Sequence, residues 1–207
     1  MDIVKTGTTT LGMVCNDATI MAADQRSSMG YLISSETMTK VLQISDKMVM
    51  TIAGTAGDGQ ALAKLMTAEL KIYSLQEGEV TVNMAASLLA TVLRSSFKSY
   101  RPDMVQILLG GYDETGPHVY SIDLAGAVED AKTFAFTGSG SPMALGVLED
   151  SYVEGMSVDD GLKLIHNALM VAKKRDLATG GHSVDVAVIT KEGIRWVPED
   201  EILKLKK

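Results

Sequence analysis

The stretch KTGTTTLG, residues 5–12, decides how the rest of the chain is interpreted. Three consecutive threonines, Thr8 to Thr10, follow Gly7. Threonine is β-branched and favours strands, so the run predicts the start of a β-strand. A threonine that directly follows a glycine can also serve as a nucleophile once the bond before it is cut. Both predictions fit together if Thr9 and Thr10 begin the strand and Thr8 lies at the cut.

Composition predicts a globular chain with one domain. Of 207 residues, 46% are hydrophobic and 22% are charged, and no shift in composition marks a linker. There are 19 Lys and Arg residues against 26 Asp and Glu, and the basic residues form no stripe, so nucleic acid is not an expected partner. The single cysteine, Cys15, cannot form an internal disulfide and is expected to be buried in a strand in a reducing compartment.

Neither a metal nor a cofactor nor a membrane is expected. The three histidines, His118, His166 and His182, are too widely spaced for a metal site. No apolar run approaches the ~18 residues that a membrane span requires. The first seven residues, MDIVKTG, lack the pattern of a secretory signal, which predicts a cytoplasmic protein and leaves this leader to be explained differently.

The periodicity of apolar residues predicts strands in pairs and helices in pairs. Amphipathic helices are expected over residues 62–73 and 85–93, from near Pro142 and from near Ser157, where Asp160 would complete a variant capping box, with a short helix from Pro198. Strands are predicted at residues 9–15, 19–24, 40–45, 48–54, 104–113, 118–123, 183–190 and 194–198.

This order of elements predicts an α+β layered fold. Tight hairpins make antiparallel sheet, and each amphipathic helix pair must cover a sheet face. The pattern leaves open whether the helices cover both faces of one sheet or the outer faces of two stacked sheets.

The chemistry expected of Thr8 depends on a base that a free N-terminus would supply. No histidine lies near a Ser or Thr in a recognisable motif, and GSGSP at 138–142 does not fit the nucleophile elbow. If the chain were cut before Thr8, its α-amine, with a pKa of about 7.7 to 8.0, could take the hydroxyl proton. Gly7 permits the strained backbone that such a cut requires. Lys40 could lower the pKa of the site, and Asp24 could hold that lysine charged.

Eight stretches, in order and sensibly spaced over nearly the whole chain, resemble the β-subunit of the proteasome, most closely the archaeal type. This resemblance implies the fold of the N-terminal nucleophile hydrolases, a four-layer αββα sandwich of two antiparallel sheets with helices outside. The stretches are GTTTLG (7–12), IMAADQRSSMG (20–30), KVLQI (40–44), MTIAGTAGDGQ (50–60), GGYD (110–113), YSIDLAG (120–126), TGSGSPMALGVLED (137–150) and KRDLATGGHSVDVAVIT (174–190).

The resemblance also implies a threonine-type endopeptidase. A propeptide, residues 1–7, would remove itself by cleavage between Gly7 and Thr8, leaving residues 8–207 as the mature domain. Asp24 and Lys40 match the acid and lysine of the catalytic centre, although many archaeal relatives carry Glu in place of the aspartate. The remaining matches are Ser139, Asp176 and Thr179, which would support the threonine amine, with Thr179 standing where the family commonly has Ser, and Gly54, whose N–H would form the oxyanion hole.

Substrate and partners follow from the same resemblance. An extended peptide would pair with the backbone of Ser28, Gly54 and Ala56. The pocket for the residue before the cut would be apolar, which predicts cleavage after hydrophobic residues. Implied partners are other β-subunits in heptameric rings, outer rings of α-subunits, a regulatory ATPase acting through the α-rings, and unfolded protein substrates. Side chains expected to line the pocket are Ser27, Met38, Leu42, Ile52 and Ala56.

Two alternatives remain at the level of the sequence. A catalytically silent ring subunit would be expected to lack one of Thr8, Asp24 and Lys40, and all three are present. A different hydrolase of the same class, such as the bacterial two-ring protease or an amidohydrolase, fits less well, because the bacterial protease is shorter and lacks the GSGSP and KRDLATGG pair in this form.

Overall fold

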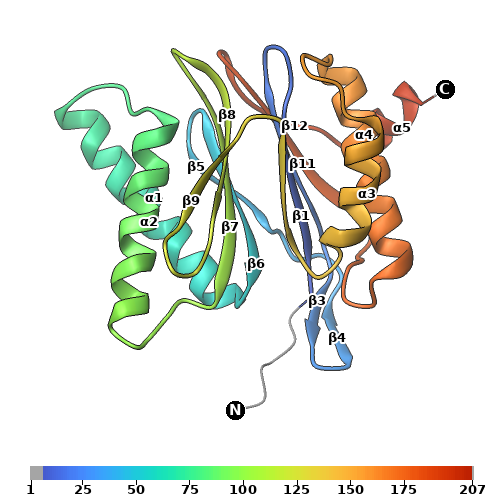
Figure 1. The fold of residues 1–207 in the computed structure, drawn as a ribbon, viewed down its shortest axis with the longest axis horizontal. Coiled ribbons are helices and arrows are strands. Elements are labelled where there is room, and N and C mark those ends of the chain that lie inside the picture. Colours follow the sequence, from blue (N-terminus) through green and yellow to red (C-terminus); the bar gives the residue numbers. More distant parts are fainter. Residues whose placement is uncertain (1–6, 207) are drawn as a thin grey trace.

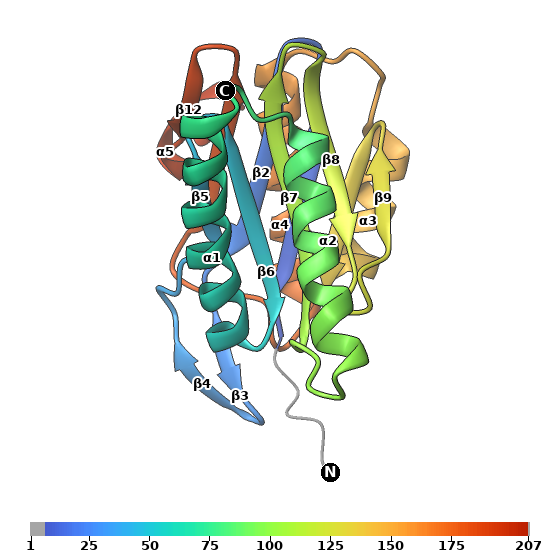
Figure 2. The ribbon, with the colours of Figure 1, turned by 90° about the vertical axis from the view of Figure 1, so that its left-hand side faces the viewer.

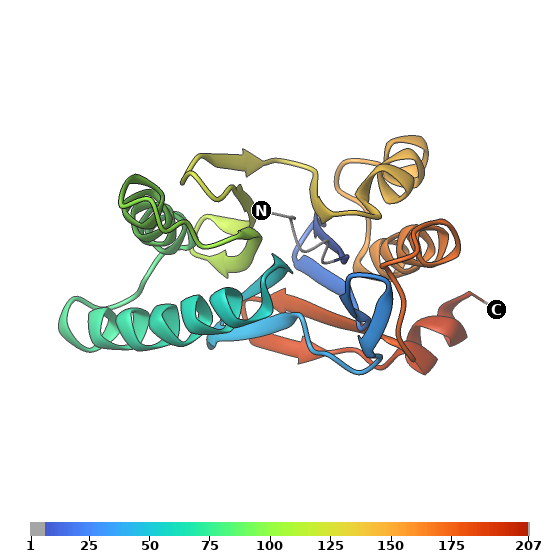
Figure 3. The ribbon, with the colours of Figure 1, turned by 90° about the horizontal axis from the view of Figure 1, so that it is seen from below.

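Two antiparallel sheets lie face to face at the centre of residues 7–206, the part of the chain that the computed structural model describes. Helices cover the outer face of each sheet, so the layers run helix, sheet, sheet, helix (Figure 1). Figure 3, seen from below, places α1 and α2 on one side of the strands and α3 to α5 on the other. The open question of one sheet or two is thereby answered in favour of the αββα sandwich.

The first sheet has the strand order β10-β1-β2-β11-β12. Its central strands are almost wholly buried, because one face meets the second sheet and the other meets helices. The strands span Thr9–Val14 (β1), Thr19–Asp24 (β2), Phe134–Gly138 (β10), Val184–Thr190 (β11) and Gly193–Trp196 (β12).

The second sheet has the strand order β5-β6-β7-β8-β9, and a separate two-stranded hairpin, β3 with β4, follows β2. The hairpin is largely exposed. The strands span Ser27–Met29 (β3), Leu32–Ser35 (β4), Val41–Ser45 (β5), Met48–Gly54 (β6), Val105–Asp113 (β7), Gly116–Ile122 (β8) and Val128–Ala131 (β9).

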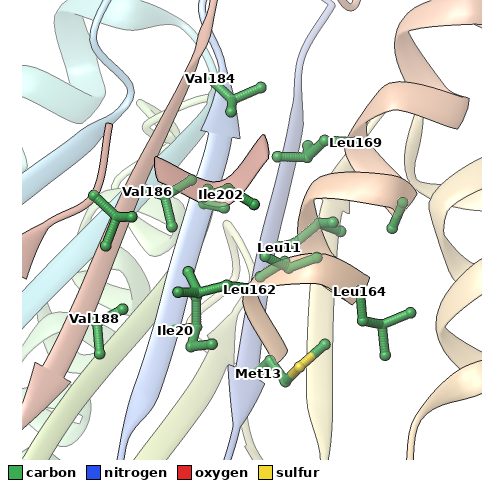
Figure 4. Close-up of a cluster of buried hydrophobic side chains, with 14 of the residues drawn as sticks. Leu11, Met13, Ile20, Leu162, Leu164, Leu169, Val184, Val186, Val188 and Ile202 are labelled. Carbon is green, nitrogen blue, oxygen red and sulfur yellow. The ribbon is translucent and has the colours of Figure 1, made fainter. Parts of the chain in front are cut away.

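Each helix buries an apolar face against its sheet. Helices α1 and α2 lie over the second sheet (Figure 2). Helices α3, α4 and α5 close a buried cluster over the first sheet, to which Leu11, Leu162 and Ile202 contribute (Figure 4). The helices span Ala56–Gln76 (α1), Val82–Lys98 (α2), Ser141–Ser151 (α3), Val158–Arg175 (α4) and Glu199–Leu205 (α5).

A third buried cluster joins the two sheets, with Met21 near its centre. Two glycines make room for this side chain. A Cβ on Gly110 would lie 2.4 Å from the Met21 sulfur, and one on Gly12 would lie 2.9 Å from it. A hydrogen bond between hydroxyl groups also crosses the seam, the interface between the two sheets: Thr51 Oγ1 donates to Thr10 Oγ1 over 2.9 Å. The separation of the sheets is therefore set by complementary small and large residues.

The structure contains four strands that the sequence pattern did not predict: β3, β4, β9 and β10. All are short, and three of them are mostly exposed, so they lack the long apolar alternation that identifies a strand. The omission of β10 matters most for the site, because this strand pairs with β1, and its Gly138 lies opposite Thr9.

Candidate active site

Thr8 lies directly before β1 and is buried, with the peptide bond to Gly7 intact. Its Oγ1 donates a hydrogen bond to the Gly7 carbonyl oxygen over 2.6 Å, and its N–H donates to Ser139 Oγ over 3.3 Å. Only glycine fits at position 7, because an added Cβ would lie 1.6 Å from the Cβ of Ala178. The Thr8 hydroxyl oxygen is thus held beside the carbonyl group of Gly7, next to the bond that the expected cut would break.

A buried ion pair between Lys40 and Asp24 lies at the same end of the sheets. Lys40 precedes β5 of the second sheet and Asp24 ends β2 of the first, and Lys40 Nζ donates to Asp24 Oδ1 over 2.7 Å. Burial lowers the pKa of the Lys40 ammonium, and the Asp24 carboxylate opposes that shift. Backbone N–H groups complete the shell of Asp24, from Thr9 (2.9 Å), Gly180 (2.8 Å) and Arg26 (3.1 Å).

Ser139, Asp176 and Thr179 form one hydrogen-bonded group on the other side of Thr8. Ser139 Oγ and Thr179 Oγ1 both donate to Asp176 Oδ2, over 2.6 Å and 2.5 Å. The hydroxyl of Thr179 is therefore free to accept from the Thr9 hydroxyl, 2.7 Å away. Because Ser139 gives its proton to Asp176, its oxygen is oriented to accept from the Thr8 nitrogen.

Gly54 ends β6 with a φ of +119°, a conformation that side chains rarely adopt. An added Cβ there would lie 2.1 Å from the Met104 carbonyl oxygen. Gly54 lines a small cavity of about 50 Å³ together with Thr8 and Lys40. Gly54 and Thr8 therefore line the same cavity, and the oxyanion-hole role of the Gly54 N–H stays a prediction.

The same small cavity is lined by most of the predicted substrate-binding residues, namely Ser27, Ser28, Met38, Ile52 and Ala56. Leu42 is the exception. It does not line this cavity but lies half-buried against the cluster beneath α1 and α2. Leu42 pairs with Met50, one step further along the sheet from the cavity than Lys40, whose carbonyl oxygen accepts from the Ile52 N–H.

A larger groove of about 850 Å³ passes the same threonine. Thr8, Ser28 and Gly54 line both the groove and the small cavity. Apolar side chains supply much of its wall, which gives the groove the character of a site for extended chains with apolar residues. These side chains are Tyr31, Leu32, Ile33, Met104, Leu124 and Leu177.

Several site residues were not predicted from the sequence. Gly180 and Thr9 hold Asp24 through their N–H groups, and a backbone donor leaves no signal in residue identity. Gly140 is required because an added Cβ would lie 2.1 Å from Thr9 Oγ1. Asp185 could have been noticed as a charge inside the apolar run SVDVAVIT, and burial raises the pKa of its carboxyl group.

Residues 7–206 contain neither a membrane-spanning helix nor a cluster of metal ligands. No helix there is long and apolar enough to cross a membrane. In the same range, His, Cys, Asp and Glu side chains nowhere gather in threes that could hold a metal ion.

Comparison with known proteins places this geometry in a family. A family model described as proteasome subunit matches residues 4–189. The proteasome subunit beta of Methanocaldococcus vulcanius is 46% identical over 207 residues, which cover 99% of this chain and 91% of the relative. That of Methanosarcina barkeri is 46% identical over 202 residues, covering 97% and 94%. With the αββα fold and a threonine at the head of β1, the chain belongs to the proteasome subunit family, among its archaeal β-subunits.

Proposed function

We propose that the chain is a threonine-type endopeptidase, the proteolytic subunit of a proteasome core, with Thr8 as its nucleophile. The observation that carries this proposal is the buried Lys40–Asp24 pair in contact with the cavity that Thr8 lines. Burying two charges is costly, and a purely structural subunit gains little from such a pair, whereas a nucleophile gains a positive charge that favours its ionised form.

The first reaction is removal of residues 1–7. The Thr8 oxygen attacks the Gly7 carbonyl carbon, the C–N bond breaks, and the nitrogen takes a proton to become the free amine. The resulting ester between Gly7 and the Thr8 oxygen is hydrolysed by water, which releases the Gly7 carboxylate. The 2.6 Å contact between the Thr8 hydroxyl and the Gly7 carbonyl group supports this order of events.

The second reaction is peptide hydrolysis by the exposed threonine. The α-amine takes the hydroxyl proton, and the oxygen attacks the substrate carbonyl carbon. The Gly54 N–H stabilises the oxyanion, and the amine returns its proton to the leaving nitrogen. Water then cleaves the acyl-enzyme ester. Lys40 keeps positive charge beside the nucleophile, and Ser139 holds the amine through the contact it already makes with the Thr8 nitrogen.

Substrate preference is proposed from the small cavity. Met38, Ile52 and Ala56 give it an apolar wall, so a hydrophobic residue before the cut would bind there and a charged one would lose its hydration. The groove would hold the rest of an unfolded chain in extended form. We further propose assembly in the cytoplasm into heptameric β-rings between α-rings, fed by a regulatory ATPase.

The test is Thr8→Ala, co-expressed with the α-subunits. The variant is expected to assemble, to retain residues 1–7 by intact mass, and to cleave no peptide. Thr190→Ala, at the end of β11 remote from Asp24, is the matched control and should behave as the unaltered chain does. A wild-type particle that retains its leader and is inactive would instead favour the silent ring subunit. Full peptidase activity in Thr8→Ala would refute Thr8 as the nucleophile.

A further inference from the structure

A set of hydrogen bonds leads from the C-terminal helix α5 to Gln25, the residue that follows Asp24. It begins at Glu199, the first residue of α5, whose Oε2 accepts from Ser183 Oγ over 2.7 Å. The Ser183 N–H donates to Gln25 Oε1 over 3.2 Å, and Gln25 Nε2 donates to Asp185 Oδ1 over 2.7 Å. Gln25 follows directly after Asp24 in the chain, so the set passes beside the candidate active site and ends at Asp185.

Glu199 is itself held firmly. Its Oε1 lies 2.8 Å from His166 Nε2, and His166 is 2% exposed. Lys206 Nζ lies 2.8 Å from His166 Nδ1. An ammonium can only donate, so Nδ1 accepts, and Nε2 carries the proton that it gives to Glu199. Ile202, on the same helix, is fully buried in the cluster beneath (Figure 4), which fixes α5 in place.

The segment 176–183, which Ser183 ends, carries much of the support for the active site. Its Gly180 N–H donates to Asp24, and its Thr179 hydroxyl contacts Asp176 and Thr9. Residues 176–183 lie outside helices and strands, and backbone hydrogen bonds hold them at a few points. The Gly180 carbonyl oxygen accepts from the N–H groups of Gln25 and Arg26, and the His182 N–H donates to the Glu36 carbonyl oxygen. Side chains add further contacts, which include Lys173 Nζ to the Gly181 carbonyl oxygen and Ser183 to Glu199.

We propose that Glu199 is a positioning residue for peptide hydrolysis: by holding Ser183 it keeps segment 176–183 where Gly180 and Thr179 support Asp24 and Thr9. This inference rests on the proposed function and extends it to a residue on another element. A loosened segment would let the Asp24 carboxylate and the Thr9 backbone shift by fractions of an ångström. Such shifts reduce the rate of the chemical step more than they reduce substrate binding.

The experiment measures kcat and KM of particles assembled with α-subunits, using a peptide with a hydrophobic residue before the cut. In Glu199→Ala and Ser183→Ala, kcat is expected to fall about tenfold with KM nearly unchanged. Ser183→Thr, which keeps the hydroxyl, should restore most of kcat. The matched control is Glu201→Ala on the same helix, which removes the exposed contact with Arg195 and should leave kcat unchanged.

The other possible results distinguish failure of the positioning role of Glu199 from failure of the proposed function. Unchanged kcat in both Ala variants, or an equal loss in Glu201→Ala, would overturn the positioning role. If Glu199→Ala fails to assemble, the kcat of Ser183→Ala tests the positioning role. If neither variant assembles, the hydrogen bond between Ser183 and Glu199 has a structural role only, and the positioning role is refuted. Measurements well below the melting temperature of every variant keep stability out of the comparison. If Thr8→Ala also cleaves the peptide, the proposed function itself has failed.

Discussion

Single residues at the candidate active site are held by charge and by hydrogen bonds, most of all around Asp24. Asp24 receives one ammonium and three backbone N–H groups. Four donors fix the position of this carboxylate, and it holds Lys40 Nζ beside the cavity that Thr8 also lines. Lysine is suited to this position because its ammonium is a compact charge on a flexible stem.

Substitution of Lys40 should therefore remove activity even when charge is kept. We expect Lys40→Ala to lower kcat at least about 100-fold, because both the charge beside Thr8 and the partner of Asp24 are lost. Lys40→Arg should rescue little, since the planar guanidinium does not fit the buried space of an ammonium. Steady-state kinetics on assembled particles would check this. Near-normal kcat in Lys40→Arg would show that charge alone suffices.

Cys15 predicts a dependence of stability on alkaline pH. It is 2% exposed, and burial raises the pKa of its thiol from 9.0 to about 12. Because the folded-state pKa is the higher one, the unfolded chain loses the proton first. The contribution is complete below pH 9.0 and is lost as pH rises toward about 12. From about pH 9.5 to about pH 10.5 the wild-type chain should lose about 1 kcal/mol more of its unfolding free energy than Cys15→Ala does.

Urea unfolding of both proteins at the two pH values measures this difference. The comparison with Cys15→Ala cancels the ionisation of the lysine and tyrosine residues that Cys15 does not influence; Tyr152, whose pKa the Cys15 charge helps to raise, is the exception. Parallel losses in the two proteins would mean that the thiol ionises equally in the folded and unfolded states.

At the scale of elements, the sequence predicted those features that depend on residues close together in the chain and missed those that depend on distant contacts. The start of α4 was predicted from Ser157 and Asp160, and the structure confirms it, with Ser157 Oγ accepting from the Asp160 N–H over 3.2 Å. Residue types at strand ends made Thr8, Asp24 and Lys40 candidates, and the resemblance to the proteasome β-subunit selected them for the site. The pairing of β10 with β1, which places Gly138 against the Thr8 carbonyl oxygen, depends on contacts across about 130 residues and leaves no local pattern.

Substitution by alanine should change stability in opposite directions at Gly54 and at Gly146. Gly54→Ala is expected to cost more than about 2 kcal/mol, because φ is +119° and the new Cβ would meet the Met104 carbonyl oxygen. Gly146 lies in the middle of α3, and a Cβ there would meet nothing within 4 Å. Gly146→Ala should therefore stabilise the chain by about 1 kcal/mol. Urea unfolding of both variants measures the change in unfolding free energy. A small loss in Gly54→Ala would show that a side chain at this position causes little strain.

At the scale of the whole molecule, the candidate active site is assembled across the seam between the two sheets. Thr8 and Asp24 come from the first sheet, whereas Lys40 and Gly54 lie at strand ends of the second. The distance between the sheets therefore sets the distance from Thr8 to Lys40 and Gly54, the residues proposed to assist it. That spacing depends on the buried cluster around Met21 and on the glycines that face it.

Met21→Ala should consequently impair both stability and catalysis. The cavity it leaves between the sheets should cost about 2–5 kcal/mol, and relaxation of the sheets toward each other should lower kcat about fivefold. Leu89→Ala is the control, because Leu89 is equally buried but lies between α2 and the outer face of the second sheet. It should lose similar stability and keep its kcat when both particles are assayed well below their melting temperatures. Equal kcat values in the two variants would show that the site tolerates changes in sheet spacing.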